Sequence, residues 1–306
     1  MTRNRLIGGL SCVLLAHAAS ASADAEYDLS GFLDYVYTGV NDLVPNQESK
    51  FDGNAEMDMK AKAMGGKVAG RVDVDFFLSN SNRDSADLEQ AFAQWNITDR
   101  MGLDVGAVNS GIGWEKEDAI DLLQTSHGQI YDFFDSQTAL AGNNVEGALF
   151  RAIIGKVNTR VGFLNDLGDS SGHNSILVQA ASDIINGFNV QGSFVTQHAQ
   201  AGNMLDVNST YRRGPLTVAV ELMTAEQTVD YGWGGMGHFD FGNRYGVTGR
   251  IDHVDYSKST FNAITSYTVA GIWDAMENFQ LYLEYRGDDN GTWNNRLTLE
   301  ALARFL

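Results

Sequence analysis

The chain has 306 residues, with 39 acidic and 21 basic side chains that give a formal net charge of −18. This acidic balance argues against a nucleic-acid-binding protein, because neutralising phosphate needs clustered Lys and Arg. A single cysteine excludes a disulfide framework and a thiolate zinc site, and an apolar fraction of 43% excludes an ordinary disordered chain.

Residues 1–23 have the pattern of a cleaved secretory signal peptide. Arg3 and Arg5 form a basic start, residues 6–19 are apolar, and 21–23 (Ala-Ser-Ala) fit a small-x-small cleavage site. The apolar stretch is shorter than the roughly 20 residues of a transmembrane helix. Too little apolar chain precedes Cys12 to favour a lipid anchor. We therefore expect a mature chain of residues 24–306 that has left the cytoplasm.

The rest of the chain alternates apolar and polar residues with a period of two, which is typical of β-strands. In 67–78, for example, Val72 and Val74 share one face, whereas Arg71 and Asp73 share the other. A soluble β-sandwich would bury the apolar face against a second sheet. The segments, however, have the length of about 10 residues that tilted membrane strands need, and little apolar sequence is left for a second layer. We therefore predict an all-β protein, a transmembrane antiparallel β-barrel with a polar inner face.

The predicted strands number sixteen. Tight connections such as 65–66 and 186–187 alternate with longer ones, as periplasmic turns and outer loops do in bacterial barrels. Four glycines in 230–241 and an ambiguous inward face in 260–272 leave fourteen or eighteen strands as alternatives. The predicted strands are 27–37, 54–64, 67–78, 87–97, 101–109, 145–154, 157–165, 175–185, 187–197, 204–212, 215–225, 230–241, 244–254, 260–272, 278–286 and 296–306.

Aromatic residues on the charge-free face gather near predicted strand ends, where membrane barrels carry two aromatic girdles. Cross-strand packing alone would explain each ring singly but not their segregation to strand ends. The girdle candidates are Trp95, Phe188, Tyr211, Tyr245, Phe279 and Phe305 at the periplasmic ends, and Tyr35, Tyr37, Phe76 and Tyr285 at the outer ends.

The connection 110–144 is far longer than the others, and such connections are usually functional or disordered. It follows the fifth strand, which makes it the third outer loop, and residues 114–123 have helical character. Lys116 is its only Lys or Arg, whereas Glu115, Glu117, Asp118, Asp121, Asp132 and Asp135 make it acidic. Trp114, Tyr131, Phe133 and Phe134 are candidates to anchor it against a wall.

Three short segments resemble the Gram-negative outer-membrane porins, and most closely the OmpL-like β-barrel porins. They are 88–92 (Leu-Glu-Gln-Ala-Phe), the approach of 105–108 into 113–115, and the final strand 299–305. The resemblance covers essentially the mature chain. It implies that the third loop folds into the lumen and forms the constriction, and it suggests a homotrimer. The family pattern ends on an aromatic residue, whereas here Phe305 is penultimate and Leu306 is last.

A porin needs no nucleophile; it needs a wet constriction whose width and charge select solutes. We expect the loop acids Glu115, Glu117, Asp118 and Asp121 to face a basic wall and to create a field across the pore. Each arginine has a competing role as an ion pair between strands, such as Arg286 with Glu284, and the loop acids have a competing role as a solvated helix face. The candidate wall cations are Arg71, Arg151, Arg160, Arg212, Arg250 and Arg286.

We therefore predict an outer-membrane porin without a cofactor, through which small hydrophilic solutes and ions diffuse passively. Loss of Arg3 and Arg5 removes two positive charges from −18 and leaves −20, which favours cations. One alternative is a substrate-specific channel with Tyr282, Trp114 and the arginines as a binding track. Another is a structural or adhesive barrel without an open pore.

Enzyme and metal signatures are weak. A barrel hydrolase would need a converging Ser, His and polar group, but neighbouring Ser126 and His127 would face opposite ways on a strand, and no Gly-x-Ser-x-Gly elbow is present. Neither 166–173 nor 288–289 has the spacing of a calcium-binding EF-hand loop. We expect neither catalysis nor a metal site.

Overall fold

The computed structural model describes residues 25–40, 49–78, 85–140, 142–168, 172–198, 201–256 and 262–305. The expected signal peptide at 1–23, with Cys12, and the terminal Leu306 lie outside these ranges. None of the helices described is long and apolar enough to cross a membrane.

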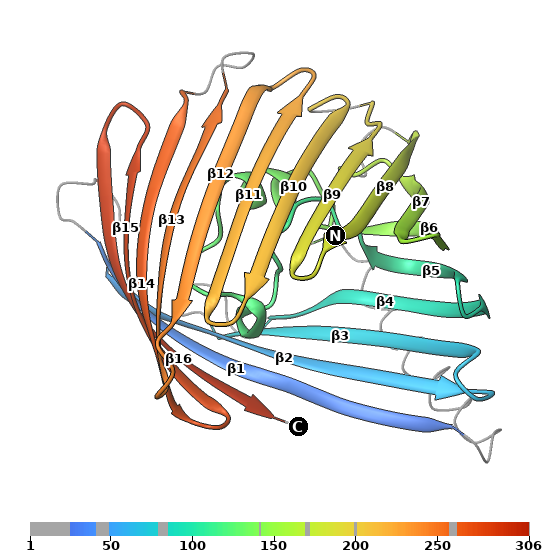
Figure 1. The fold of residues 1–306 in the computed structure, drawn as a ribbon, viewed down its shortest axis with the longest axis horizontal. Coiled ribbons are helices and arrows are strands. Elements are labelled where there is room, and N and C mark those ends of the chain that lie inside the picture. The colour runs from blue at the N-terminus through green and yellow to red at the C-terminus, as the bar shows by residue number, and fades with distance from the viewer. Residues whose placement is uncertain are drawn as a thin grey trace.

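Sixteen antiparallel strands close into one barrel, in which each strand pairs with its neighbours in sequence and β1 pairs with β16 (Figure 1). This confirms the predicted all-β class and strand number. The strands are β1 (Glu26–Val40), β2 (Lys50–Ala63), β3 (Val68–Leu78), β4 (Ser85–Thr98), β5 (Met101–Asn109), β6 (Asn144–Ile154), β7 (Val157–Asn165), β8 (Asn174–Ile185), β9 (Phe188–Val195), β10 (Met204–Arg213), β11 (Leu216–Ala225), β12 (Val229–Asp240), β13 (Tyr245–Asp255), β14 (Ile264–Met276), β15 (Phe279–Asp289) and β16 (Trp293–Phe305).

Strand β14 corrects the prediction, because it lies four residues later than 260–272. Ser266 and Thr268 are buried on its inward face, while Tyr267 and Val269 are exposed on the other. A register shift between Asp274 and Met276 lets the pairing with β15 continue, so the tight turn falls at 277–278 rather than at 274–277.

The barrel reverses the burial pattern of a soluble protein. On its outer face Val207, Val220 and Leu222 are 44%, 50% and 62% exposed, whereas the inward-facing Asp206 and Glu284 are fully buried. The apolar faces therefore point away from the interior and do not meet in a dry layer between two sheets, which excludes the soluble sandwich.

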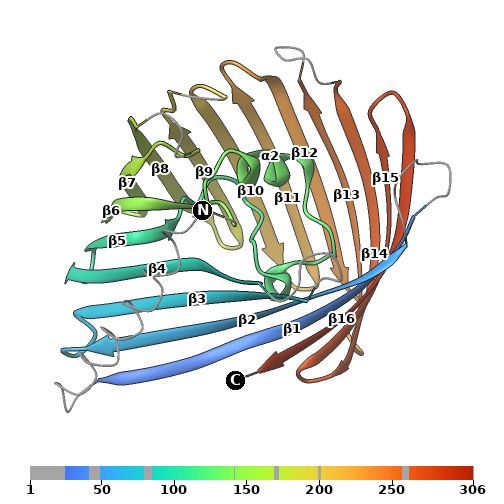
Figure 2. The same cartoon turned by 180° about the vertical axis from the view of Figure 1, so that it is seen from behind.

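The alternation predicts an inner face that is polar throughout, but part of the observed inner face is apolar. Inward-facing side chains at the ends of β6, β7, β8 and β10 that are far from the tight turns form an apolar cluster, which includes Leu149, Leu164, Leu177 and Met204. These side chains are apolar because they pack against a helix of the long third connection rather than against water. Figure 2 shows that helix, α2 (Gln129–Ser136), within the ring of strands.

Candidate pore constriction

Residues 110–143 connect β5 to β6 and contact the inward-facing side chains of the barrel; we call them the inner loop. The loop starts close to the wall because Gly111 and Gly113 have φ values of 69° and 84°, which favour glycine. A Cβ on Gly111 would collide with the guanidinium of Arg160. The glycines therefore allow the backbone to turn against β7.

Helix α2 attaches the inner loop through one apolar face. Ile130, Phe133 and Phe134 are at most 4% exposed in the apolar cluster, and Asp132 lies on the exposed side. This spacing of three and four residues is that of an amphipathic helix. The helical character expected at 114–123 is limited to the three-residue turn η1 (Ala119–Asp121), so that the main helix of the loop was not predicted.

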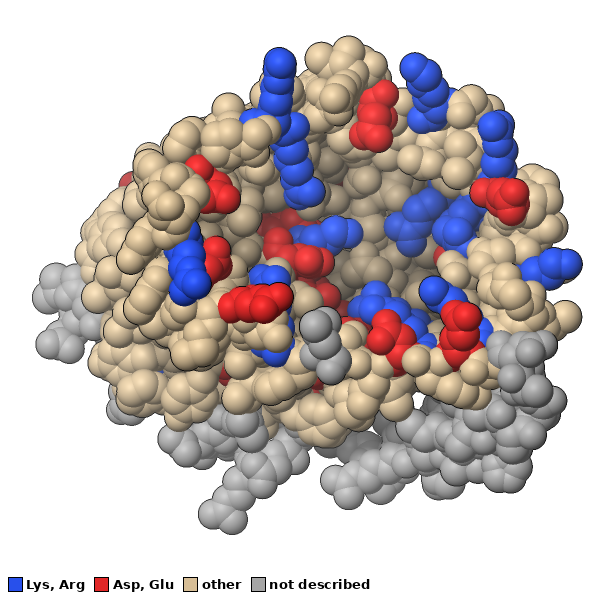
Figure 3. Space-filling model, turned by 60° about the horizontal axis from the view of Figure 1, so that its bottom comes forward, with Lys and Arg blue, Asp and Glu red and all other residues tan. Residues whose placement is uncertain are grey.

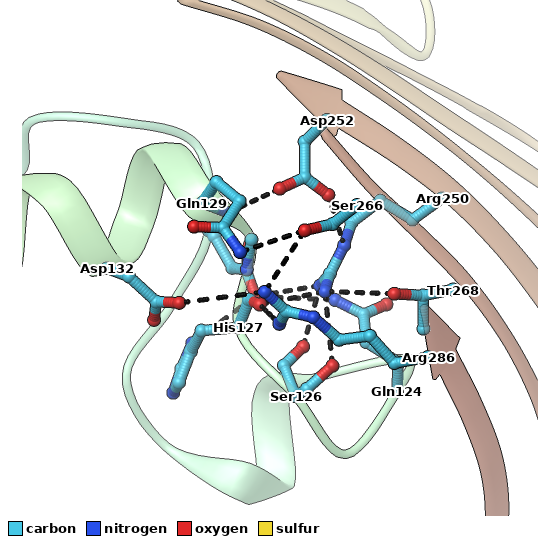
Figure 4. Close-up of polar contacts among 12 residues, drawn as sticks. Gln124, Ser126, His127, Gln129, Asp132, Arg250, Asp252, Ser266, Thr268 and Arg286 are labelled. Carbon is cyan, nitrogen blue, oxygen red and sulfur yellow. Dashed lines mark hydrogen bonds and ion pairs between the residues drawn. The ribbon is translucent and has the colours of Figure 1, made fainter. Parts of the chain in front are cut away.

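Two buried arginines hold the loop from the opposite wall (Figure 4). Arg250 on β13 donates to the carbonyl oxygens of Ser126 at 2.6 Å and His127 at 2.8 Å, and Arg286 on β15 donates to that of His127 at 2.5 Å. Both side chains are 2% exposed. Arg286 also pairs with Asp288 at 2.7 Å and lies 3.9 Å from Asp132. These two cations are therefore committed to the loop instead of facing open water.

Carboxylates of the wall accept backbone N–H groups of the same loop. Glu284 accepts those of Thr125 at 2.9 Å and Ser126 at 3.1 Å, and Asp252 accepts that of Gln129. Glu221 on β11 accepts the N–H of Trp114 at 3.1 Å. The competing pair of Arg286 with Glu284 is replaced by these contacts, because the buried N–H groups of the loop also need an acceptor.

Glu115 is buried between the loop and the wall, where it stabilises the loop instead of lining water. Its carboxylate lies 3.2 Å from His127 Nδ1 and 3.5 Å from Arg250 Nη1, and it accepts the N–H of Gly128 at 3.0 Å. Burial alone would raise its pKa, but Arg250 and His127 outweigh burial and lower the pKa of Glu115. The same carboxylate raises the pKa of His127, against the opposing effect of burial.

Glu117 and Asp118 face an acidic wall instead of the expected basic one. Burial, together with nearby acids such as Glu89 on β4, raises the pKa of Glu117 to about 8 and that of Asp118 to about 6. His127 opposes this rise at Glu117, and Arg71 opposes it at Asp118. Asp121, by contrast, is exposed. The four loop acids thus have three roles: Glu115 anchors the loop, Glu117 and Asp118 lie near other acids, and Asp121 faces solvent.

The remaining arginines also have defined partners or positions. Arg71 pairs with Asp58 at 2.8 Å and Asp73 at 2.5 Å, and Arg151 pairs with Asp104 at 2.7 Å. Both arginines therefore form ion pairs along the wall, which is the structural role that competes with pore selectivity. Arg160 donates to the carbonyls of Asn109 and Ser110, where the inner loop begins. Arg212 is exposed beside a cavity.

Two cavities flank the stretch 116–121 of the inner loop. One, of about 380 Å³, is bordered by Arg71, Glu117, Asp118 and Arg160. The other, of about 550 Å³, is bordered by Arg212 and by residues near the tight turns of β12 to β16. Lys116 and Asp121 border both cavities. Figure 3 shows a hollow in which basic and acidic side chains gather, so the interior offers charged surface to a small solute.

Several residues that hold the loop were not predicted. Arg304 donates to the carbonyl of Ile120 at 3.1 Å, and Gln191 donates to those of Gly111 and Gly113 at 3.0 and 3.1 Å. Their only signal in the sequence is a polar side chain on an inward face. That signal does not tell which strand lies opposite which part of the loop.

The residues considered for a hydrolase, a metal site or a substrate-binding track have other contacts. Ser126 Oγ lies 3.2 Å from Arg250, and His127 pairs with Glu115. Asp288 is the ion-pair partner of Arg286, and Asp169 lies outside the described residues. Tyr282 is 3% exposed in a small apolar cluster and borders the larger cavity.

Most of the aromatic candidates lie toward strand ends, but Tyr35 and Tyr285 lie nearer the middle of β1 and β15, because both strands extend further than predicted. Trp95, Tyr245 and Phe305 are 53–54% exposed at the ends that carry the tight turns. Among the others, Tyr35, Phe76 and Tyr285 are exposed, and Tyr37, Phe188, Tyr211 and Phe279 are partly exposed. The prediction did not include the exposed rings of Phe51, Tyr231, Trp233, Phe241, Tyr267, Trp273 and Trp293.

Solved structures of porins have the same fold. Two engineered variants of the Rhodopseudomonas blastica porin match 92% of this chain and all of their own, with TM-scores of 0.69 and 0.67 and identities of 11% and 13%. A loop-deletion variant of OmpT, an outer membrane protein of Vibrio cholerae, matches 92% of this chain and 99% of its own, with a TM-score of 0.65 and 10% identity. No family model and no curated protein matches the sequence. The likeness establishes a porin-like barrel fold.

Proposed function

We propose that this protein is an outer-membrane porin that lets small hydrophilic solutes and ions diffuse through its barrel. The observation that carries the proposal is the closed barrel with an apolar outer face and a charged hollow interior, which one long loop crosses. An apolar outer face suits acyl chains, and a charged interior suits water and hydrated solutes.

The inner loop is the constriction in this proposal. Its backbone is fixed by Arg250, Arg286 and Arg160, and the stretch 116–121 stands between the two cavities. The selective groups are then Asp118 and Asp121, because the buried arginines and Glu115 serve as anchors. Glu117 adds a negative charge only at alkaline pH, since burial raises its pKa to about 8. Acids on both the loop and the facing wall favour cations over anions.

The setting of the channel is part of the same proposal. We place the barrel in the outer membrane of a Gram-negative cell, after removal of residues 1–23. Membership of the OmpL-like porins and assembly as a homotrimer follow from the sequence resemblance alone. Heat-resistant bands on unboiled gels of the purified protein would test the trimer.

Conductance in a planar lipid bilayer tests the channel directly. We expect stepwise conductance and a reversal potential in a salt gradient that reports cation preference. Saturable block by one solute would favour the substrate-specific channel instead. Absence of conductance, even after removal of 114–140, would favour the structural barrel.

A pair of variants tests whether the inner loop constricts the pore. Arg250→Ala removes the donor to two loop carbonyls and the cation beside Asp252 and Glu115. We expect a several-fold higher conductance, because removing one partner of a buried ion pair destabilises the docked loop by about 3–5 kcal/mol. Arg151→Ala is the matched control, since Arg151 pairs with Asp104 on β5 instead. Equal conductance of the two variants would contradict the constriction.

A further inference from the structure

Strands β2, β3 and β4 bring an unusual set of acids together on the inner wall. Glu56 lies directly opposite Asp75, and Asp58 lies directly opposite Asp73. Like charges in opposed positions of a sheet destabilise it. Two consecutive inward pairs of this kind therefore need compensation from a positive charge.

A β-bulge adds another carboxylate to this set. The register between β3 and β4 shifts from Asp73 opposite Gln90 to Val74 opposite Leu88, so Glu89 is the extra residue of β4. Glu89 is 1% exposed, and its Oε1 accepts the amide of Asn144 at 2.9 Å. Bulges re-aim side chains, and this one turns a carboxylate toward Glu56 and Asp75.

Arg71 compensates only one of the two pairs. It contacts Asp58 and Asp73, and no Lys or Arg within the described ranges forms an ion pair with Glu56, Asp75 or Glu89. The nearest loop charges, Glu117 and Asp118, are also acidic. The excess negative charge is thus concentrated on Glu56, Asp75 and Glu89.

Two buried oxygens of this set point to a missing ligand. Glu56 is 5% exposed, and its Oε1 has no hydrogen-bond partner; the same is true of Oε2 of Glu89. A buried carboxylate oxygen without a donor is costly, so native structures usually supply a proton donor or a cation. Asn54, on the same face of β2, also has a buried oxygen without a partner.

We propose that Glu56, Asp75 and Glu89 bind a Ca²⁺ ion on the inner wall of the barrel. One oxygen from each carboxylate lies within 4.8 Å of the other two. The centre of three oxygens at that spacing lies about 2.8 Å from each (4.8 Å divided by √3), close to the 2.3–2.6 Å of a Ca²⁺–oxygen bond. Bidentate carboxylates, the oxygen of Asn54 and water complete the six to eight ligands that Ca²⁺ takes.

The proposed Ca²⁺ site lies close to the proposed constriction, but Ca²⁺ binding there does not depend on the constriction. Asp118 lies close enough to Glu56 to interact with it electrostatically and also borders the smaller cavity, so an ion can reach the wall from the hollow. Bound Ca²⁺ would reduce the repulsion between the wall and Asp118. Binding does not require the barrel to conduct, so failure of the channel proposal and failure of this one are distinguishable.

Equilibrium dialysis of the purified, detergent-solubilised barrel against radioactive Ca²⁺, after removal of metal by EDTA, tests the site. We expect one Ca²⁺ per chain and at least tenfold weaker binding in Glu56→Gln and Glu89→Gln. Asp206→Asn is the matched control, because Asp206 is a fully buried inward carboxylate on β10, outside this set. It should bind Ca²⁺ like the unchanged protein.

Thermal unfolding, followed by gel mobility, provides a second measurement. Ca²⁺ should raise the midpoint of the unchanged protein and of Asp206→Asn but not that of Glu89→Gln. In EDTA, Glu89→Gln should be more stable than the unchanged protein, because it lacks the repulsion of Glu89 with Glu56 and Asp75. If Glu89→Gln fails to fold, Asp75→Asn replaces it in both measurements. No saturable Ca²⁺ binding, or binding that survives these substitutions, would overturn the proposal.

Discussion

Buried charges inside the barrel act mainly by holding backbone. Arg250 and Arg286 each donate to loop carbonyls, and Glu284 accepts loop N–H groups. A guanidinium with five donors can satisfy carbonyls and carboxylates at once, which makes its burial tolerable. The inner loop therefore takes its position from individual side chains of the wall.

The Glu115–His127 pair predicts a pH dependence of stability. Because the folded-state pKa of His127 is raised, its contribution is fully present below its unfolded value of 6.5 and is lost as pH rises through the raised value. The lowered pKa of Glu115 gives a contribution that is present above 4.5 and is lost as pH falls through the lowered value. We expect the pair to stabilise the protein most between pH 4.5 and 6.5.

Comparing the protein with His127→Gln measures this contribution. The difference between their thermal unfolding midpoints should be largest near pH 5.5 and should shrink at alkaline pH. Glu117, Asp132 and Arg250 also act on the pair, but they are present in both proteins and largely cancel in the comparison. A difference that is constant from pH 5 to 10 would show that His127 acts only through packing.

At the scale of elements, strands were predictable from local pattern, and the inner loop was not. Alternation within about ten residues determines which face of β3 or β15 is apolar, so the sixteen strands follow from the sequence. The contacts of the loop link residues far apart, such as Thr125 with Glu284. No local pattern encodes such a pair, so Glu115 and Arg250 were assigned to the pore although they anchor the loop.

Strand β14 and helix α2 show two further limits. The inward face of β14 carries the small side chains of Ser266, Thr268 and Ala270, so its polar and apolar faces contrast weakly. In α2, the apolar residues Ile130, Phe133 and Phe134 face an apolar inner wall. That wall was expected to be polar throughout, so the surface against which α2 packs could not be predicted.

The packing of α2 predicts how the inner loop can be released. Phe134→Ala removes a ring that is 2% exposed in the apolar cluster, which should destabilise the docked loop by about 3–5 kcal/mol. Lys116 is exposed and is the only trypsin site in 110–143. Trypsin should therefore cleave the variant faster at Lys116. Phe163→Ala, which removes a ring that is 58% exposed on β7, is the control and should be cleaved at the original rate.

At the scale of the whole molecule, the barrel has two different interiors. Around α2 the wall is apolar and packed, whereas β2, β3 and β4 carry acids. The inner loop touches both regions, since Phe134 lies in the apolar cluster and Asp118 lies near Glu89. The loop thus fills one side of the barrel and leaves charged cavities elsewhere.

The orientation of the strands in lipid predicts which face of the barrel tolerates an added charge. Val220 lies near the middle of β11, is 50% exposed and faces outward, whereas Thr210 on β10 faces inward and borders the smaller cavity. Val220→Arg should destabilise the barrel in lipid vesicles by about 2–4 kcal/mol, because it places a charge among acyl chains. Thr210→Arg should cost much less, because the added cation meets water and acids. Urea unfolding of both variants in vesicles measures the two values, and a larger loss for Thr210→Arg would mean that the outer face of the barrel does not contact lipid.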